Sequence, residues 1–579
     1  MMETNKAAKV MEEIGIMLEM KGENPFKSRA YYSAARVIDV MGDEELKRLM
    51  REDKLKEVKG IGTALNEKLK ELVLTGTLVY YQELKASIPE GLFEILKVPG
   101  LGPRKVSVLY ETLDITTIAE LEYACRENRL VSLKGFGSKT QQNIIAGIDF
   151  LRRHQGRHFY SEAIGLANQL TEALQNFPGV AYASLAGSIR RSREIVKDID
   201  LVAASDEPFS VGQFFSGLPN VEQVVARGET KVTVQLIEGI NADLRVVKPE
   251  QFPYALHHFT GSKEHNTALR SRAKSLGLKM NEYGLFRGEE LIQCSSEEDL
   301  FAALGLVFIP PELRENNGEI EAAGQDALPH LVETTDIRGI FHIHTSYSDG
   351  SDGLEDIVRG CLAAGYEYIG ISDHSQSAFY AGGLKEDDLK RQEEEILKLR
   401  EQFPALAIFW GIESDITTDG SLDYPDPIME KFDFIIASVH SGLKMERNRM
   451  NERLKRVLEH PLVTILGHPT NRLLLGRDAS LIDLEVVFEA AQKNGVVIEL
   501  NANPARLDLD WRYLKKARDM GLRISINPDA HNVQGFGDTE FGVAIARKGW
   551  LEKKDIFNSM RREEMDCYLD RRRHLNSGR

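Results

Sequence analysis

Two aspartates spaced two residues apart are the first pair in the chain whose side chains could do chemistry. Asp198 and Asp200 lie in the run DIDLVAA, which predicts a β-strand, so both side chains leave the same face roughly 6 to 7 Å apart. Asp243, in the β-like run INADLRVV, can join them. Three convergent carboxylates can hold two Mg²⁺ ions for phosphoryl or nucleotidyl transfer. A D-x-D pair taken alone is more often a solvated strand edge.

The segment that precedes these aspartates favours the catalytic interpretation. Gly187 and Ser188 offer backbone and hydroxyl donors to a triphosphate. Arg190 and Arg191 offer positive charge to the same group. The pattern G-S-x-R-R upstream of D-x-D therefore indicates a nucleotidyl-transfer site.

A second set of reactive residues occupies the C-terminal half, where His, Asp and Glu residues close or follow apolar runs. They are His342, His344, Asp349, His374, Glu413, His440, His468, Asp529 and His531. In a regular strand His342 and His344 would lie on the same face and could chelate one ion. Asp529 and His531 have the same spacing and could chelate an ion in the same way. Imidazole and carboxylate ligands suit Mn²⁺, Zn²⁺ or Fe²⁺. The four cysteines form no C-x-x-C pair, which argues against a thiolate zinc site and a disulfide framework.

Three G-x-G segments near the N-terminus resemble one another. Each follows an apolar helical turn and precedes an amphipathic helix. The glycines allow a tight turn that points backbone N–H groups outward at a helix N-terminus, where a phosphate is favoured. One such segment would more often serve packing, but three copies resemble the helix-hairpin-helix module, which implies DNA-backbone contacts at Gly60, Gly62, Gly100, Gly102, Gly135 and Gly137.

The elements that must position these residues follow from length and periodicity. A chain of 579 residues predicts three or four domains. Helical patterns fill the N-terminal region, and from about residue 160 short β-like runs mix with helices, which predicts an α+β domain. After a segment dense in Pro, Gly, Asn and acidic residues at 316–335, which we expect to be an exposed linker, apolar runs alternate with amphipathic helices. That alternation predicts a parallel β/α architecture, closed into a barrel because the candidate ligands follow its strands.

Composition narrows the class of protein. Apolar residues make up 42% and charged residues 28%, as in ordinary globular chains, so neither a disordered nor a fibrous class is indicated. The net charge is −16, but basic residues cluster locally, as at Arg190, Arg191 and Arg193, and a local stripe decides phosphate contact. No membrane span or signal peptide is recognisable, so we expect a cytoplasmic, nucleoid-associated protein.

The spacing from G-S-x-R-R to D-x-D resembles the palm of the family X DNA polymerases, and the resemblance covers residues 1 to about 315. It implies that Asp198, Asp200 and Asp243 are catalytic and hold Mg²⁺ or Mn²⁺. The segment 259–286 is similar to the family's thumb. The resemblance implies nucleotide binding by Gly187, Ser188, Arg191, His258, Phe259, Gly261, Asn266 and Arg270.

Two positions depart from the family pattern. His258 stands where the family usually has a tyrosine beside the incoming sugar, which bears on selection against ribose. The N-terminal region resembles the family's lyase domain, in which a lysine forms a Schiff base with an abasic sugar, and Lys68 occupies that position. Lys27 is present, but Ala64 and Tyr80 replace further lysines, so an ordinary solvated Lys68 is an equal alternative.

The nine histidine and acid positions resemble those of the polymerase and histidinol phosphatase (PHP) domain, a distorted barrel that hydrolyses phosphoesters. The resemblance implies up to three Mn²⁺, Zn²⁺ or Fe²⁺ ions. Glu413 would bridge a first ion, shared with His342, His344 and Asp529, to a second. The second ion would be held by His440 and His468, and the third by Asp349, His374 and His531. The alternative is a structural metal site or a degenerate domain.

These observations predict a multidomain chain with a fixed order. The expected domains are a lyase-like helical domain at 1–85, helix-hairpin-helix fingers at 86–155, an α+β nucleotidyltransferase palm at 156–248, a thumb at 249–315, a linker at 316–335 and a PHP domain at 336–579. We expect a monomeric gap-filling repair polymerase that uses dNTPs on gapped or primer-template DNA, with a metal-dependent 3′-5′ exonuclease or phosphoesterase. The alternatives are a DNA-targeted hydrolase and a DNA-end scaffold, each with an inactive polymerase half.

Overall fold

The computed structural model describes residues 4–52, 54–58, 60–126, 129–130, 133, 135–154 and 156–577. The chain forms two compact units, Met1–Gln155 and Gly156–Arg579. Residues 131, 132 and 134 of the third predicted G-x-G segment lie outside the described residues.

The first unit is helical in its described residues. Helix α2 begins at Pro25, and the Asn24 side chain accepts a hydrogen bond from Phe26 N at 3.0 Å, which caps the helix N-terminus. The apolar faces of the helices share one core that includes Met11, Leu69 and Leu109. The helices are α1 Thr4–Met20, α2 Pro25–Met41, α3 Asp43–Arg51, α4 Thr63–Thr75, α5 Val79–Ala86, α6 Gly91–Leu96, α7 Pro103–Leu113, α8 Ile118–Arg126 and α9 Ser138–His154.

The second unit begins with a five-stranded mixed sheet in the order β2-β4-β7-β6-β5. Strands β4 and β7 pair in parallel and the other pairs are antiparallel. The strands β5, β6 and β7 alternate with turns, while α10 and α12 supply apolar residues to the core beneath the sheet. The elements are α10 Tyr160–Gln175, β2 Tyr182–Leu185, α11 Gly187–Arg190, β4 Asp198–Ala204, α12 Pro208–Ser216, β5 Val221–Arg227, β6 Lys231–Leu236 and β7 Asn241–Val247.

The thumb region follows, with helices around a three-stranded antiparallel sheet in the order β10-β9-β8. Its elements are α13 Phe252–Thr260, α14 Lys263–Ser275, β8 Lys279–Asn281, β9 Gly284–Arg287, β10 Glu290–Ile292, α15 Glu297–Ala303 and α16 Glu319–Gly324.

Helix α16 lies in the segment that we expected to be an exposed linker. Ile320 and Ala323 of this helix pack in the same core as Leu269 and Phe301 of the thumb. The Glu319 carboxylate is fully buried and pairs with His265 Nδ1 at 2.5 Å. The expectation of an exposed linker is therefore wrong for Glu319, Ile320 and Ala323, whereas residues 316–318, 321 and 324–327 are exposed.

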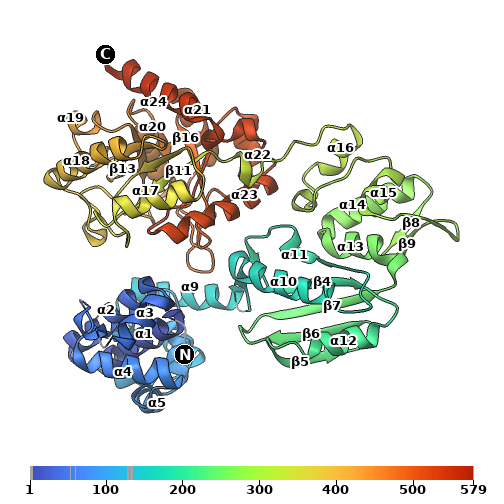
Figure 1. The fold of residues 1–579 in the computed structure, drawn as a ribbon, viewed down its shortest axis with the longest axis horizontal. Helices are drawn as coiled ribbons and strands as arrows, with labels where there is room; N and C mark the ends of the chain where they lie inside the picture. Colours follow the sequence, from blue (N-terminus) through green and yellow to red (C-terminus); the bar gives the residue numbers. More distant parts are fainter. Residues whose placement is uncertain are drawn as a thin grey trace. The chain divides into compact units, whose positions relative to one another are not determined.

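The rest of the second unit is a parallel β/α barrel of seven strands in the order β11 to β17. Each strand is followed by a helix, and a parallel bridge between Ile343 and Ala530 joins the last strand region to the first. Figure 1 shows α17, α18 and α21 to α24 grouped around these strands. The strands are β11 Gly339–Ile343, β12 Tyr368–Ile371, β13 Ala407–Asp415, β14 Phe434–Ser438, β15 Ile465–Leu466, β16 Val497–Asn501 and β17 Ile524–Asn527.

The helices of this barrel are α17 Leu354–Ala363, α18 Glu386–Gln402, α19 Asp426–Met429, α20 Arg447–Leu458, α21 Leu484–Asn494, α22 Trp511–Asp519, α23 Thr539–Lys548 and α24 Arg562–Ser577. All seven strands are buried along their length, as parallel strands covered by helices must be. The predicted fold class, with a helical N-terminal region, an α+β palm with thumb and a distorted β/α barrel, is confirmed.

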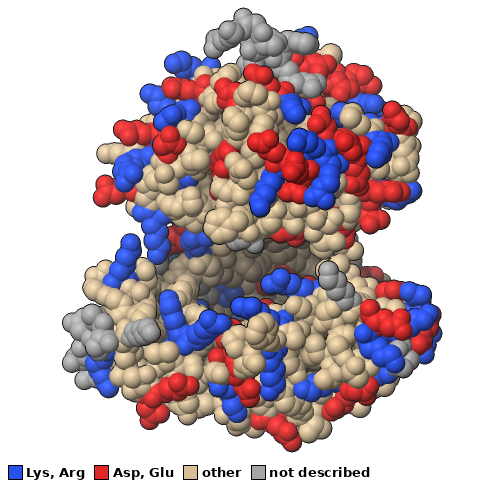
Figure 2. Space-filling view, turned by 90° about the vertical axis from the view of Figure 1, so that its left-hand side faces the viewer, with Lys and Arg blue, Asp and Glu red and all other residues tan. Residues whose placement is uncertain are grey.

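Surface charge is mixed on the face drawn in Figure 2, where Lys and Arg side chains are interspersed with Asp and Glu side chains. Among the described residues, no helix is both long enough and apolar enough to cross a membrane.

Candidate functional site: two clusters of carboxylates and histidines

The parallel pairing of β4 with β7 brings the three palm aspartates together. Asp200 lies directly opposite Asp243 in the register, and Asp198 points to the same face two residues earlier. Asp243 accepts a hydrogen bond from Thr233 Oγ1 at 2.5 Å and pairs with Lys231 Nζ at 2.7 Å. The side chain of Asp243 is thus held in place by the neighbouring strand β6.

Nearby cations balance the negative charge of this cluster only in part. Burial, together with the neighbouring Asp198 and Asp243, raises the pKa of Asp200 to about 7. Burial and Asp243 also raise the pKa of Asp198. Asp198 and Asp200 therefore resist ionisation beside each other. A cluster of carboxylates of this kind is suited to divalent cations with oxygen ligands, such as Mg²⁺ or Mn²⁺.

Gly187 is required by the close approach of the G-S-x-R-R turn to Asp200. A Cβ atom at Gly187 would lie 1.8 Å from Asp200 Oδ2, and the glycine has a left-handed φ of +60°. The Ala186 N–H donates to Asp200 O at 2.9 Å. Ser188 is the next residue and Arg191 lies three residues further on, so the predicted triphosphate donors begin beside the carboxylates.

The two arginines of this turn have different surroundings. Arg190 donates to Thr260 Oγ1 at 2.7 Å and to Glu297 at 2.6 Å, so its charge is already paired within the thumb. Arg191 donates from Nε to Glu315 at 3.0 Å and from Nη1 to Thr260 O at 2.6 Å. Arg191 also lies close enough to Asp200 to oppose the rise in its pKa.

The remaining predicted nucleotide contacts lie on α13, on α14 and at Gly261 between them. Asn266 donates to His258 O at 2.7 Å and to Gly261 O at 3.1 Å, which ties the two helices together. A Cβ atom at Gly261 would lie 2.4 Å from Asn266 Oδ1, so the glycine allows this contact. The guanidinium carbon of Arg245 lies 5.4 Å from the centroid of the Phe259 ring. Arg270 is exposed on α14.

The G-x-G segments share one geometry in the first unit. The first glycine of each pair, at 60, 100 and 135, has a left-handed φ of 99°, 89° and 89°. The second glycine of each pair, at 62, 102 and 137, precedes α4, α7 and α9. A Cβ atom at any of the three second glycines would meet nothing within 4 Å, so packing among the described residues does not explain them.

Lys68, on α4, is partly buried between two tyrosines. Its Nζ donates to Tyr31 Oη at 2.5 Å and lies 3.4 Å from the centroid of the Tyr80 ring. Burial and the charge of Lys27 lower the pKa of the amine. The ring of Tyr80 favours the charged form instead, so the lyase role of Lys68 stays a prediction.

The nine histidine and acid positions meet at the carboxyl ends of the barrel strands. They form four overlapping groups, and within each group the possible ligand atoms all lie within 4.8 Å of one another. They are His344 with Asp349, His374 and His531; His342 with Glu413 and His468; His342 with His344 and Asp529; and His374 with Glu413 and His440.

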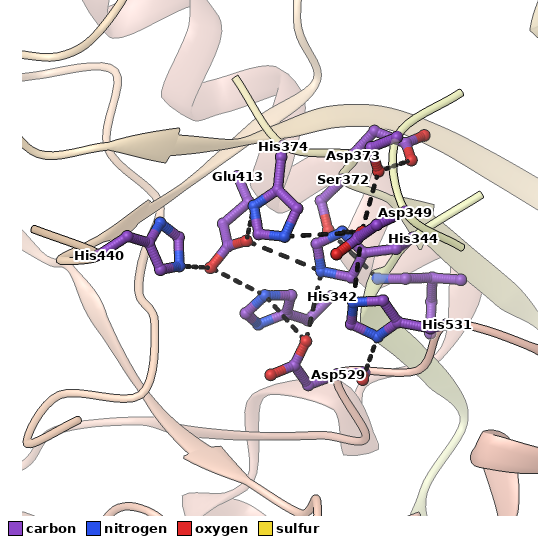
Figure 3. A network of polar contacts seen from close by, with 12 residues as sticks. His342, His344, Asp349, Ser372, Asp373, His374, Glu413, His440, Asp529 and His531 are labelled. Atoms are coloured by element: carbon purple, nitrogen blue, oxygen red, sulfur yellow. Dashed lines mark hydrogen bonds and ion pairs between the residues drawn. The ribbon is translucent and has the colours of Figure 1, made fainter. Parts of the chain in front are cut away.

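Glu413, on β13, is the centre of the cluster (Figure 3). Its carboxylate is 3.1 Å from His342 Nε2, 3.2 Å from His440 Nε2 and 3.0 Å from His468 Nε2. Asp349 occupies the other end, 3.6 Å from His374 Nε2 and 3.3 Å from His531 Nε2. His440 thus groups with His374 as well as with Glu413, which differs in part from the pairing implied by the resemblance.

Several polar atoms of this cluster are buried without a hydrogen-bond partner among the described residues. They are His342 Nε2, both ring nitrogens of His344, Glu413 Oε2 and His468 Nδ1. Burying such atoms unpaired is costly. The donor set of imidazole nitrogens and carboxylate oxygens fits transition-metal ions, which would satisfy these atoms.

The backbone is strained at three of these positions. His342, His468 and Asp529 have φ values of 62°, 24° and 53°, a region that non-glycine residues rarely adopt. The register between β11 and β12 also shifts between Ile340 and Ile343. The H-x-H pair therefore does not lie on a regular strand as expected, although its ring centroids are only 5.3 Å apart.

Residues outside the predicted set orient the histidines. Glu499 accepts a hydrogen bond from His342 Nδ1 at 2.6 Å and from His468 N at 2.6 Å. Asp415 pairs with His440 Nδ1. These contacts fix which ring nitrogen faces the cluster. The sequence signal for Glu499 is an acid inside the apolar run VVIELN, where a buried partner is required.

The pKa values of two histidines in the cluster are shifted in opposite directions. Burial and the neighbouring His374 lower the pKa of His344 to about 3, so its ring is neutral and able to ligate a metal. Burial opposes protonation of His440, but Glu413 and Asp415 outweigh it and raise its pKa to about 10. A divalent cation would take the place of such protons.

Family models match four parts of the chain. A helix-hairpin-helix domain model matches residues 2–78, and a SAM-like helix-hairpin-helix tandem model matches residues 93–149. A DNA polymerase beta thumb model matches residues 255–315, and a PHP domain model matches residues 341–503. Domains of the last kind and polymerase palms depend on metal ions.

Three relatives illustrate the similarity. The Repair DNA polymerase X of African swine fever virus is 31% identical over 140 residues, which cover 22% of this chain and 78% of that protein. A probable phosphatase of a Thermoanaerobacter species is 27% identical over 237 residues, which cover 38% of this chain and 89% of that protein. The DNA polymerase/3′-5′ exonuclease PolX of Bacillus subtilis is 37% identical over 567 residues, 97% of this chain and 98% of that protein. The chain therefore belongs to the bacterial family X DNA polymerases with a C-terminal PHP domain.

Proposed function

We propose that this DNA polymerase fills short gaps during DNA repair and that its PHP domain removes nucleotides from 3′ ends. The observation that carries the proposal is the presence of two separate clusters, one of three palm carboxylates and one centred on Glu413. The two clusters share no residue and lie on different sheets. The name of the Bacillus subtilis relative, which joins both activities, supports the same division.

In the palm, Asp198, Asp200 and Asp243 would hold Mg²⁺ or Mn²⁺. Arg191, Ser188 and the N–H groups of the Gly187 turn would hold the triphosphate beside them. Phe259 and Gly261 would lie against the sugar, and Asn266 and Arg270 over the nascent pair and the template. The work of these residues is to position the primer end and the nucleotide for in-line transfer.

In the PHP domain, the nine clustered residues would hold up to three Mn²⁺, Zn²⁺ or Fe²⁺ ions. Such ions supply a water of lowered pKa and neutralise phosphate charge. Glu413 is placed to bridge the groups of ligands, because five histidines lie within 4 Å of its carboxylate oxygens. A cluster of this kind hydrolyses phosphoesters, and DNA held by the polymerase regions is the substrate that we assign to it.

The G-x-G turns of the first unit would hold the DNA backbone. Their second glycines are open to solvent among the described residues, so a phosphate can approach the N–H groups at the starts of α4, α7 and α9. We propose that the monomer binds gapped or primer-template DNA in this way without reading its sequence.

One assay of the wild-type protein tests these assignments together. On a 5′-labelled primer facing a one-nucleotide gap, we expect single-nucleotide addition with dNTPs and shortening of the primer without them. A chelator should abolish both reactions. Mn²⁺ should support shortening better than Mg²⁺, because Mg²⁺ favours octahedral oxygen ligands over imidazole.

The outcomes separate the alternatives. Shortening without addition would identify a DNA-targeted hydrolase, and DNA binding with neither reaction would identify an end-binding scaffold. Full shortening by a metal-stripped protein supplied with Mg²⁺ alone would assign hydrolysis to the palm carboxylates and contradict the PHP assignment.

A further inference from the structure

A buried lysine of the PHP domain reaches the polymerase site. Lys548 is the last residue of α23, and its side chain is 0% exposed. Its Nζ donates to Glu315 Oε1 at 2.6 Å, to Arg191 O at 2.9 Å and to Glu312 O at 3.3 Å. An ammonium group is costly to bury unless it is paired, so these acceptors account for its position.

Glu315 connects Lys548 to Arg191, the arginine that we propose contacts the triphosphate. The same oxygen that accepts from Lys548 also accepts from Arg191 Nε at 3.0 Å. On its other side, Arg191 Nη1 donates to Thr260 O at 2.6 Å. Two anchors at different nitrogens fix the plane of a guanidinium group, so Arg191 is oriented before any nucleotide binds.

The residues after Arg191 are held by the PHP domain as well. Glu194 accepts from Trp511 Nε1 at 3.1 Å and from Arg512 Nη1 at 3.1 Å, both on α22. Ser192, between the two contacts, is buried and has a left-handed φ of 51°. The turn that carries Arg191 is therefore held from the PHP side at both of its ends.

We propose that Lys548 and Glu315 are positioning residues for Arg191, so that the PHP domain forms part of the polymerase's nucleotide site independently of its own metal cluster. This inference rests on the proposed contact of Arg191 with the triphosphate. A guanidinium group that is already ordered loses less freedom on binding, and this lowers the KM for the nucleotide.

Single-nucleotide insertion by the full chain tests the proposal. Lys548→Met keeps the side-chain volume but removes the charge and its three hydrogen bonds. We expect the KM for dNTP to rise about tenfold, the loss of one charge-assisted contact, with kcat changed less than about twofold. Glu315→Gln should act in the same direction, and Lys548→Arg should restore part of the affinity.

Arg547→Met is the matched control. Arg547 precedes Lys548 on α23 and donates to Glu312 at 2.6 Å across the same interface, but its other hydrogen bond goes to Val332 O rather than to Arg191 or Glu315. We expect this variant to keep the wild-type KM. Both variants should keep DNA shortening by the PHP domain, which shows that the interface has not unfolded.

Two results would overturn the inference. The first is an unchanged KM in Lys548→Met, and the second is an equal rise of KM in Arg547→Met, which would reveal a general loosening of the interface. If insertion by wild type is normal but Arg191→Lys leaves the KM unchanged, the assignment of Arg191 to the triphosphate fails, and this inference fails with it.

Discussion

At the scale of single residues, Glu499 orients two residues of the PHP site, although it is not one of the nine candidate ligands. Its carboxylate is fully buried and contacts His342, the backbone of His468 and Asn527 Nδ2. The carboxylate therefore holds His342 with Nε2 directed at Glu413.

Glu499→Gln should lower metal affinity without removing any of the nine candidate ligands. The amide keeps the shape but cannot support the His342 ring as a carboxylate does, so we expect about a 10- to 100-fold loss of affinity. Titration of the metal-free protein with Mn²⁺, followed by DNA shortening, measures the effect. Glu489→Gln, at an exposed position of α21, is the control, and equal affinity in both variants would contradict the role of Glu499.

Sequence identified the site residues that interrupt an apolar pattern at a strand end, but it could not identify partners that only the fold brings together. His344 and His440 directly follow apolar runs, where a polar side chain at a strand end is visible in the pattern. Glu499 lies inside such a run, and its partner His342 is distant in the chain, so only the fold pairs them. The left-handed backbone of Asp529 has no sequence signal of its own.

At the scale of elements, the register of β4 and β7 could be expected only in part. The sequence predicts two strands with acids on one face, but their parallel pairing, with Asp200 opposite Asp243, arises from the sheet order. Helix α16 was not expected, because its six residues are too short to show a helical period. Its burial comes from contacts with the thumb core, which local sequence does not encode.

Helix α15 provides an element-scale test through its first residue. Glu297 lies between Arg190 and the fully buried Arg314. Burial works against ionisation of Glu297, but the two arginines outweigh it and lower its pKa from 4.5 to about 2. Glu297→Gln leaves Arg314 without its counterion and should reduce the free energy of unfolding by about 3–5 kcal/mol, measured by urea denaturation.

The pH dependence has a defined sign. Because the pKa is lower in the folded chain, Glu297 stabilises the fold at neutral pH, and this contribution is lost as pH falls from about 4.5 to about 2. Glu297→Gln should lack that part of the acid sensitivity. Glu298→Gln, its exposed neighbour, should match wild type, and equal stability of the two variants would contradict the buried ion pair.

At the scale of the whole molecule, two metal-dependent domains lie in one compact unit. The palm and the barrel contact each other through Glu194, Trp511 and Lys548, yet their clusters draw on different strands. Chemistry at one cluster should therefore survive loss of the other, while nucleotide affinity should depend on the contact between the domains. The sequence predicted both domains from separate motifs but offered no signal for this contact, because its residues are distant in the chain.

The measurement that tests this account most directly compares two double variants on one labelled primer in a gapped duplex, with and without dNTPs. Asp198→Ala with Asp200→Ala should abolish nucleotide addition and leave primer shortening at the wild-type rate. His342→Ala with His344→Ala should abolish shortening, lose bound transition metal by elemental analysis, and leave addition intact. Loss of both reactions in either variant would contradict the assignment of two separate active sites.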